Sequence, residues 1–249
     1  PKGFDAVVMI EDVHDVGGER FEITRAVTPW QHVRMAGEDA IEGDVVLARG
    51  RRIGPFEIGA LLAVGRTEVT VVKRPVVGIL PTGDELIEPG DVPTPGAVVE
   101  LNSHMISAMV REWGGEPRRY APVGDDEPRL EATLRAMLGA CDVVVVNAGS
   151  SAGRGDLTPT IVARLGRVLV HGIDLMPGKP TLVGVVDGKP VIGLPGYPVS
   201  TVVAAEALLR PLTALLLGTV LDDRPRVAAR LSRPCPSRAG LEEIVRVRL

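Results

Sequence analysis

The sequence predicts an α/β protein in which a parallel or mixed sheet carries helices on both faces and is flanked by small β-rich segments. Short apolar runs alternate with helical patterns in the middle of the chain, the flanking stretches alternate apolar and polar residues, and 45% of the residues are hydrophobic. We therefore expect part of a β-rich domain at 1–41, a linking segment at 42–73, the α/β domain at 74–218 and the start of a second β domain at 219–249.

The first segments have the pattern of a hairpin followed by a helix. Asp5 to Glu11 is expected to be a strand, Gly17 and Gly18 a turn, and Phe21 to Thr24 the returning strand. A linking helix is expected over Phe56 to Val64, because a Gly-Pro pair precedes it and a glycine follows it.

The central region is expected to hold strands and helices in turn. The predicted strands are Val76 to Leu80, Val143 to Asn147 and Val191 to Leu194. The predicted helices run from a cap at Asn102-Ser103 to Gly114, over Glu127 to Ala140 with Asp126 as its cap, from Thr158-Pro159 to Gly166, and over Val199 to Leu217 before Gly218. This alternation favours a parallel sheet. A last strand is expected at Ile244 to Leu249.

The composition argues against several classes of protein. The net charge is −4, the basic residues are scattered and only 3% of residues are aromatic, so we expect no nucleic-acid partner. No apolar run approaches about eighteen residues and the first residues lack a signal-peptide pattern, which predicts a cytoplasmic protein without a membrane partner. The cysteines and histidines lack the spacing of a zinc site, so any metal is expected to be held by oxygen.

The first of four informative loops directly follows the strand at Val76 to Leu80. In an open parallel sheet, ligands bind outside the carboxyl ends of the strands. Here Thr82 can donate to a phosphate oxygen, Gly83 allows close backbone approach, and Asp84 and Glu85 can hold a divalent cation or a proton. Taken alone, this sequence could equally be a turn with solvated acids.

The second loop, Asn147 to Asp156, lies between an apolar strand and the helix opened by Thr158-Pro159. Unpaired N–H groups at a helix start, together with hydroxyls, can bind an anion. We therefore expect a phosphate cradle, and the alternative is a flexible glycine loop. The loop lacks the lysine of the common nucleotide-binding loop. The cradle residues are Gly149, Ser150, Ser151 and Gly153.

The third and fourth loops are two proline-glycine turns. Prolines on either side of a glycine stiffen the backbone, so each turn can hold amide groups in place. Lys179 in the third loop would offset the charge of a bound anion. The expected ligand-binding residues are Pro177, Gly178 and Lys179 in one turn and Pro195, Gly196 and Pro198 in the other.

In their order and position, these four loops resemble the sheet domain of the molybdopterin molybdenumtransferase family, which includes the enzymatic end of gephyrin. The likeness spans nearly the whole chain. It implies that residues 74–218 bind adenylylated molybdopterin and that the enzyme inserts metal from molybdate into the dithiolene, releasing AMP with the help of Mg²⁺. Cleaving a phosphoanhydride requires offsetting negative charge, which a carboxylate-held metal and a lysine would do.

The resemblance also implies roles for individual acids. Asp39 matches the acid of a segment that faces the partner subunit's sheet domain in this dimeric family, and with Glu85 and Asp156 it is expected to be catalytic. Glu85 and Asp156 are the expected contacts for Mg²⁺ or molybdate. Asp125 and Asp126 match paired acids that follow the third strand, and they join the loop residues above as expected substrate-binding residues.

Three positions depart from the family's pattern. Asn147-Ala148-Gly149 stands where members commonly have Thr-Gly-Gly or Ser-Gly-Gly, Met176 stands where a basic residue is often found, and Tyr197 replaces an asparagine. These departures bear on whether molybdate or tungstate is accepted and on turnover itself. The family's Asp-Gly-Tyr-Ala segment is absent. The chain starts without methionine in one apparent strand and stops at Leu249 in another, so we expect a fragment of a longer protein.

Two other functions stay open. The related molybdopterin adenylyltransferase shares the sheet domain, although it does not need flanking β units. It makes the adenylylated intermediate, so it is also an expected partner. The second alternative is a non-catalytic sensor or scaffold that binds molybdopterin without turnover.

Overall fold

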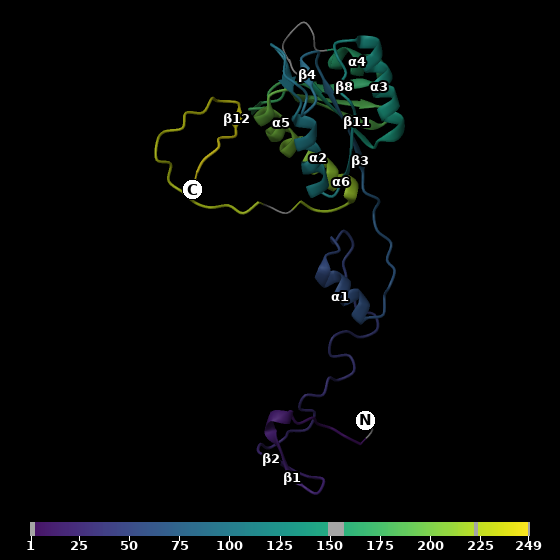
Figure 1. Ribbon diagram of the computed structural model, residues 1–249, viewed down its shortest axis with the longest axis vertical. Coiled ribbons are helices and arrows are strands. Elements are labelled where there is room, and N and C mark those ends of the chain that lie inside the picture. The colour runs from purple at the N-terminus through teal and green to yellow at the C-terminus, as the bar shows by residue number, and fades with distance from the viewer. Residues whose placement is uncertain (1–2, 149–156, 222–223, 249) are drawn as a thin grey trace. The chain divides into compact units, whose positions relative to one another are not determined.

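The computed structural model describes residues 3–148, 157–221 and 224–248. The chain divides into two compact units, the first ending at Val69 and the second beginning at Thr70 (Figure 1).

The first unit contains a 3₁₀ helix, a short hairpin and an α-helix, and none of residues 3–69 is buried. Its elements are the 3₁₀ helix η1 (Ile10–Asp12), β1 (Val13–Gly17), β2 (Arg20–Ile23) and α1 (Pro55–Ala63). The predicted glycine turn and linking helix are confirmed. The predicted strand at Asp5 to Glu11 is wrong, because the short returning strand pairs back only as far as Val13.

The second unit is built on a six-stranded mixed sheet. In spatial order the strands are β6 (Glu116–Arg119), β3 (Val76–Thr82), β7 (Val143–Ala148), β11 (Lys189–Pro195), β10 (Leu182–Val186) and β8 (Arg167–His171). The first four are parallel, whereas β10 runs antiparallel to both β11 and β8. The sheet with its three predicted strands is confirmed. The antiparallel edge formed by β10 and β8 was not among the predicted elements.

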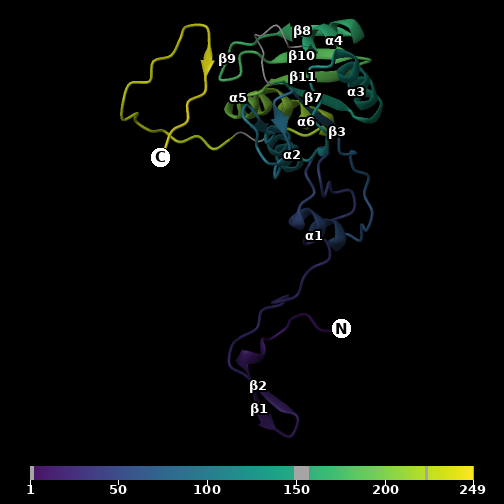
Figure 2. The same cartoon turned by 45° about the horizontal axis from the view of Figure 1, so that its top comes forward.

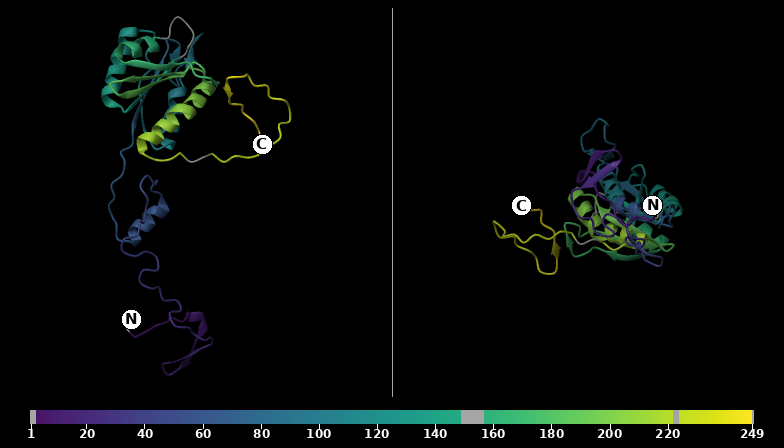
Figure 3. Two further views of the ribbon diagram at one scale, coloured as in Figure 1. Left: turned by 180° about the vertical axis from the view of Figure 1, so that it is seen from behind. Right: turned by 90° about the horizontal axis from the view of Figure 1, so that it is seen from below.

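Helices cover both faces of this sheet (Figure 2, and from behind in Figure 3). Side chains alternate along a strand, so Val144 and Val146 pack toward α3 (Glu127–Ala140) and α4 (Thr158–Leu165). Val143 and Val145 face the opposite layer, which contains α2 (Asn102–Glu112) and the helix that follows β11. A strand that is buried on both faces has a continuous apolar sequence, which explains why β3 and β7 could be predicted from the sequence.

The helix after β11 is continuous from Pro198 to Leu217. It consists of α5 (Pro198–Ala204), the π-helical η2 (Ala205–Leu209) and α6 (Arg210–Leu217), and it ends at Gly218 in the left-handed region, as predicted. With a mean hydropathy of 1.5, it is long and apolar enough to cross a membrane. However, Ala204, Ala205 and Leu209 are fully buried against the sheet, which identifies it as a core helix.

Two small parallel pairs lie outside the main sheet. In the first, β4 (Leu86–Ile87) pairs with β5 (Val98–Val99), and in the second, β9 (Leu175–Met176) pairs with β12 (Glu242–Glu243). The predicted strand at Ile244 to Leu249 is wrong: within residues 224–248 the pairing ends at Glu243, and only the Ile244 N–H continues it, to the Met176 carbonyl.

The starts of two helices test the predicted caps. The Asp126 carboxylate accepts from the Arg129 N–H at 3.0 Å, so the predicted cap of α3 is confirmed. The predicted cap of α2 is wrong, since Asn102 and Ser103 already lie inside the helix. The buried Glu100 carboxylate caps it instead, by accepting from the Ser103 N–H at 2.8 Å.

Removing the cap of α3 is expected to destabilise the sheet domain measurably. Asp126→Ala leaves the Arg129 N–H without its side-chain acceptor, so we expect a loss of about 1 kcal/mol in the free energy of unfolding. Urea denaturation measures this loss. Asp126→Asn keeps an acceptor at the same position and is the matched control. Equal losses for the two variants would mean that the charge, not the cap, matters.

Candidate functional site

The strand ends that lead into three of the four predicted loops lie side by side at one edge of the sheet. Thr82 at the end of β3 is paired with Ala148 at the end of β7, and Ala148 is paired with Pro195 at the end of β11. The third loop precedes a strand instead of following one. It leads into β10, which is antiparallel to β11 and whose first residue Leu182 pairs with Gly193 near the end of β11. The second loop follows Ala148 directly, but the predicted residues Gly149, Ser150, Ser151, Gly153 and Asp156 lie outside the described residues.

A small pocket opens at this edge, with about 250 Å³ of space that is partly continuous with solvent. The ends of β7 and β11, the start of α4 and the third loop form its wall. The lining residues are Ala148, Thr158, Pro180, Leu182, Gly193, Leu194 and Pro195.

Acidic side chains from two loops gather beside the end of β3. Thr82 forms a bridge with Val123, and the Gly83 N–H donates to the Val123 carbonyl at 3.0 Å. This pairing brings Asp125 to Asp84, whose carboxylate accepts from the Asp125 N–H at 3.1 Å. Partial burial, and then the Asp84 and Glu85 carboxylates, raise the pKa of Asp125. The predicted acids Asp84, Glu85 and Asp125 therefore share one site, whereas Asp126 caps α3.

This acid cluster fits a divalent cation in part. Carboxylate oxygens are the ligands that Mg²⁺ uses, and mutual repulsion among acids is relieved by a cation. Within the described residues, no group of three or more acidic, histidine or cysteine side chains forms a complete metal site. Glu85 supplies one of the two predicted ligands here, and the other, Asp156, is outside the described part of the chain.

A methyl group on Gly83 is expected to displace the Glu85 carboxylate. Gly83 has φ +142°, and a Cβ there would lie 2.4 Å from Glu85 Oε2. Gly83→Ala should therefore cost about 1–3 kcal/mol of stability through its backbone and also weaken Mg²⁺ binding. Gly96→Ala is the matched control, because Gly96 has φ +90° with no neighbour within 4 Å of a Cβ. Equal Mg²⁺ affinity in both variants, measured by titration calorimetry, would contradict this placement of Glu85.

Thr82 is buried, and its hydroxyl donates to the Asn147 carbonyl at 3.4 Å. As a phosphate donor it would have to give up this long bond. Its position therefore supports the join between β3 and β7, and its contact with phosphate stays a prediction.

The third loop is a tight turn that presents Lys179 to solvent. The Ile173 N–H donates to the Lys179 carbonyl at 2.8 Å, and the Thr181 hydroxyl donates to the Gly178 carbonyl at 2.7 Å. The peptide bond between Met176 and Pro177 is cis. Among the described residues the Lys179 amine makes no ion pair, so its charge remains available to an anion at this edge.

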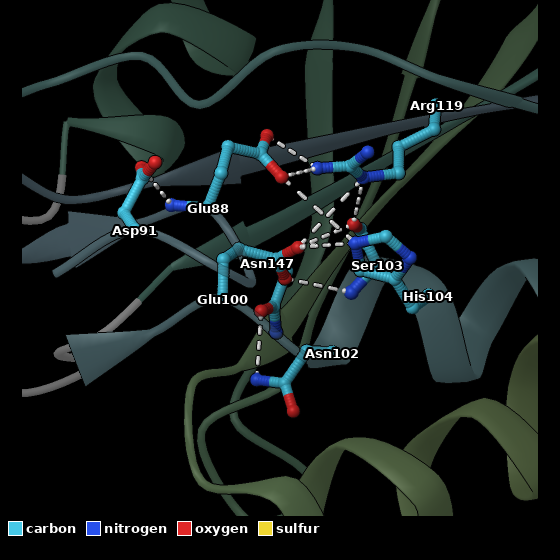
Figure 4. Close-up of polar contacts among 8 residues, drawn as sticks. All are labelled: Glu88, Asp91, Glu100, Asn102, Ser103, His104, Arg119 and Asn147. Atoms are coloured by element: carbon cyan, nitrogen blue, oxygen red, sulfur yellow. Dashed lines mark hydrogen bonds and ion pairs between the residues drawn. The ribbon is translucent and has the colours of Figure 1, made fainter.

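Asn147, a departure from the family's pattern, joins the fourth loop to the sheet. It is 4% exposed, and its amide N–H groups donate to the Pro195 carbonyl at 2.7 Å and the Leu194 carbonyl at 3.3 Å. Its amide oxygen accepts from Asn102 at 2.9 Å (Figure 4). Asn102 also donates to the Gly196 carbonyl at 2.6 Å. This network, which the sequence did not suggest, fixes the turn at Pro195 and Gly196.

Asp39 belongs to the first unit, where it forms an ion pair with Arg34. Its side chain is 69% exposed. Its role opposite a partner subunit stays a prediction.

Two family descriptions match the chain. The "probable molybdopterin binding domain" matches residues 78–214, over half of the chain, and the "MoeA N-terminal region (domain I and II)" matches residues 1–65. The first covers the six-stranded sheet except for the first two residues of β3. It also covers residues 82–85, which we call the acid loop.

Curated relatives and a solved structure agree with these matches. Molybdopterin molybdenumtransferase 2 of Mycobacterium tuberculosis is 33% identical over 252 residues, which are 99% of this chain and 62% of that protein. The molybdopterin molybdenumtransferase of Haemophilus influenzae is 33% identical over 218 residues, 88% of this chain and 54% of that protein. A crystal structure of a MoeA protein from Pyrococcus horikoshii superimposes with a TM-score of 0.71 at 37% identity, covering 86% of this chain and 53% of that one.

The chain thus spans about 62% or less of the length of these relatives. The mixed sheet and the order of its loops agree with the resemblance inferred from the sequence. The chain belongs to the molybdopterin molybdenumtransferase family, whose molybdopterin-binding sheet domain and N-terminal region it carries.

Proposed function

We propose that this chain carries the site at which metal from molybdate or tungstate is inserted into adenylylated molybdopterin, with release of AMP. The observation that carries the proposal is that an acid cluster and an exposed lysine lie at the same edge of the sheet of a molybdopterin-binding domain, and that this lysine makes no ion pair among the described residues. The acids come from the first loop and Asp125, and the lysine is Lys179 in the third loop.

The residues of this edge would act mainly on charge and position. Lys179 would offset the phosphate charge, and the rigid turns at 177–180 and 195–198 would hold backbone groups against the pterin. Glu85 and Asp156 would hold Mg²⁺, which when bound supplies charge neutralisation at the phosphoanhydride. Thr82, together with the glycines and serines of residues 149–153, would orient the phosphate oxygens.

The proposal also covers the partner proteins of this chain and the compartment in which it acts. A molybdopterin adenylyltransferase would supply the adenylylated substrate. A homodimer would let Asp39 of one subunit face the sheet domain of the other, and its 69% exposure is compatible with that role. Light scattering on the natural protein tests this arrangement, and an active monomer would contradict it. We place the reaction in the cytoplasm.

The first test is AMP release from adenylylated molybdopterin on the longest natural form of the protein, with Mg²⁺ and either molybdate or tungstate. Release stimulated by one oxyanion would establish the transferase and its metal. Tight binding of molybdopterin without release would favour a sensor or scaffold. Formation of the adenylylated species from ATP and molybdopterin would favour the adenylyltransferase.

A further inference from the structure

Five side chains form a polar cluster next to the acid loop, among residues that the proposed site does not use (Figure 4). We call it the Arg119 cluster. Its members come from four elements: Glu88 follows β4, Glu100 follows β5, Ser103 and His104 belong to the first turn of α2, and Arg119 ends β6.

Arg119 contacts carboxylates from two of these elements. Its terminal nitrogen donates to both carboxylate oxygens of Glu88, and its Nε donates to the Ser103 hydroxyl at 2.7 Å. The same Nε lies 3.8 Å from Glu100 Oε2. Because guanidinium is planar and its donors are fixed, these contacts determine its orientation as well as its charge.

Glu100 anchors the cluster in the protein. Its side chain is 2% exposed, and its oxygens accept from the Ser103 N–H at 2.8 Å and the Ser103 hydroxyl at 2.5 Å. A buried carboxylate requires both hydrogen bonds and an opposite charge nearby. Arg119 supplies that charge, with His104 Nε2 3.9 Å from each of the two glutamates. Glu100 thus fixes Arg119, and Arg119 in turn fixes Glu88.

Glu88 is linked through the backbone to Glu85, the described candidate ligand for the cation. The segment 85–88 contains β4, whose ladder with β5 spans two residues. Its bonds run from the Val98 N–H to the Glu85 carbonyl and from the Glu100 N–H to the Ile87 carbonyl, both at 2.8 Å. An isolated pair of such short strands holds its position weakly. The bond between Arg119 and Glu88 ties the far end of this segment to the main sheet.

We infer that Arg119 is a positioning residue for the acid loop: acting through Glu88, it holds the Glu85 carboxylate beside Asp84 and Asp125. The inference rests on the proposed function, because it takes Glu85 as a ligand of the cation. Arg119 itself touches neither the cation nor the substrate. A purely structural Arg119 would affect folding stability and leave cation affinity unchanged.

The experiment measures binding of Mn²⁺ to the natural full-length protein without substrate, by electron paramagnetic resonance. Mn²⁺ takes the same oxygen ligands as Mg²⁺ and gives a direct signal. Arg119→Ala and Glu88→Gln are each expected to weaken Mn²⁺ binding by about 10-fold, as for residues that orient metal ligands. Arg118→Ala is the matched control, since Arg118 precedes Arg119 on β6 and donates instead to the Ala140 carbonyl at 3.3 Å. It should bind Mn²⁺ as the unmodified protein does.

Kinetics supply a second readout. In AMP release, Arg119→Ala should raise the half-saturating Mg²⁺ concentration by about 10-fold, while the KM for adenylylated molybdopterin stays unchanged. Glu88 is 41% exposed at its side chain, so Glu88→Gln is expected to fold even if Arg119→Ala does not.

Two results would overturn the inference, and they are distinguishable. If Glu85→Gln abolishes Mn²⁺ binding while Glu88→Gln and a folded Arg119→Ala bind normally, Arg119 has no positioning role and the proposed cation site stands. If Glu85→Gln itself binds Mn²⁺ normally, the cation site of the proposed function is wrong, and the inference falls with it.

Discussion

Glu85→Gln is expected to lower kcat for AMP release by about 100-fold, or about 3 kcal/mol of barrier, because it removes a charge that would hold the cation. The fold should be unaffected: the Glu85 side chain is exposed, and it is the backbone carbonyl of Glu85 that pairs with β5. Single-turnover AMP release at saturating Mg²⁺ measures the effect. Asp156→Asn is expected to cause a loss of similar size.

The matched control is Asp91→Asn, in the same loop segment. Asp91 accepts from the Glu88 N–H at 3.2 Å, and asparagine keeps an oxygen for that bond while removing the same unit of charge. It should leave kcat close to that of the unmodified protein. If both substitutions lower kcat equally, the general negative charge of the loop is responsible and Glu85 has no specific role.

Asn147→Ala is expected to destabilise the sheet domain by about 3 kcal/mol, because it leaves buried polar groups unpaired on both sides. The Pro195 and Leu194 carbonyls lose their donor, and Asn102 loses an acceptor in a region where its own amide oxygen already lacks a partner. Urea denaturation measures the loss. Molybdopterin affinity should fall as well, because the turn at Pro195 and Gly196 is no longer fixed.

Asn147→Asp distinguishes the stability lost with the hydrogen bonds of Asn147 from the stability lost with its side-chain volume. Aspartate has nearly the same shape and keeps an acceptor toward Asn102, but it places an oxygen against the Pro195 carbonyl, where Asn147 donates at 2.7 Å. It should therefore be at least as destabilising as alanine. Thr160→Ala, on the exposed face of α4, is the control and should change stability by less than about 0.5 kcal/mol. A near-neutral Asn147→Asp would show that packing, and not hydrogen bonding, is what Asn147 contributes.

The elements that the sequence predicted correctly are those with local signals. The apolar runs of β3 and β7, the Asp126 cap of α3, and Gly218 after α6 each act within a few residues, so their physical cause is visible in one stretch of sequence. The two wrongly predicted strands are places where the outcome depended on a pairing partner elsewhere in the chain. Residues 5–11 and 244–248 alternate like strands, but a strand also requires a neighbour to pair with.

The candidate site shows the same division. The motifs at Thr82 to Glu85 and at Lys179 identified the family, because these loops are continuous in sequence. The sequence did not indicate that Asn102 pairs with Asn147, 45 residues away, or that Arg119 pairs with Glu88, 31 residues away. Asparagine, arginine and glutamate are common residues, and these four side chains acquire a role only because the fold brings them into contact.

The α/β class, the succession of β3, β7 and β11 with helices between them, and the family could all be predicted from the chain, because hydrophobic periodicity, caps and loop motifs are local. The antiparallel edge formed by β10 and β8, the burial of the Asn147 amide and the bond between Arg119 and Glu88 became known from the folded structure. Strand partners and buried polar pairs are selected by packing between segments distant in the chain, where each hydrogen-bonding group must find a partner.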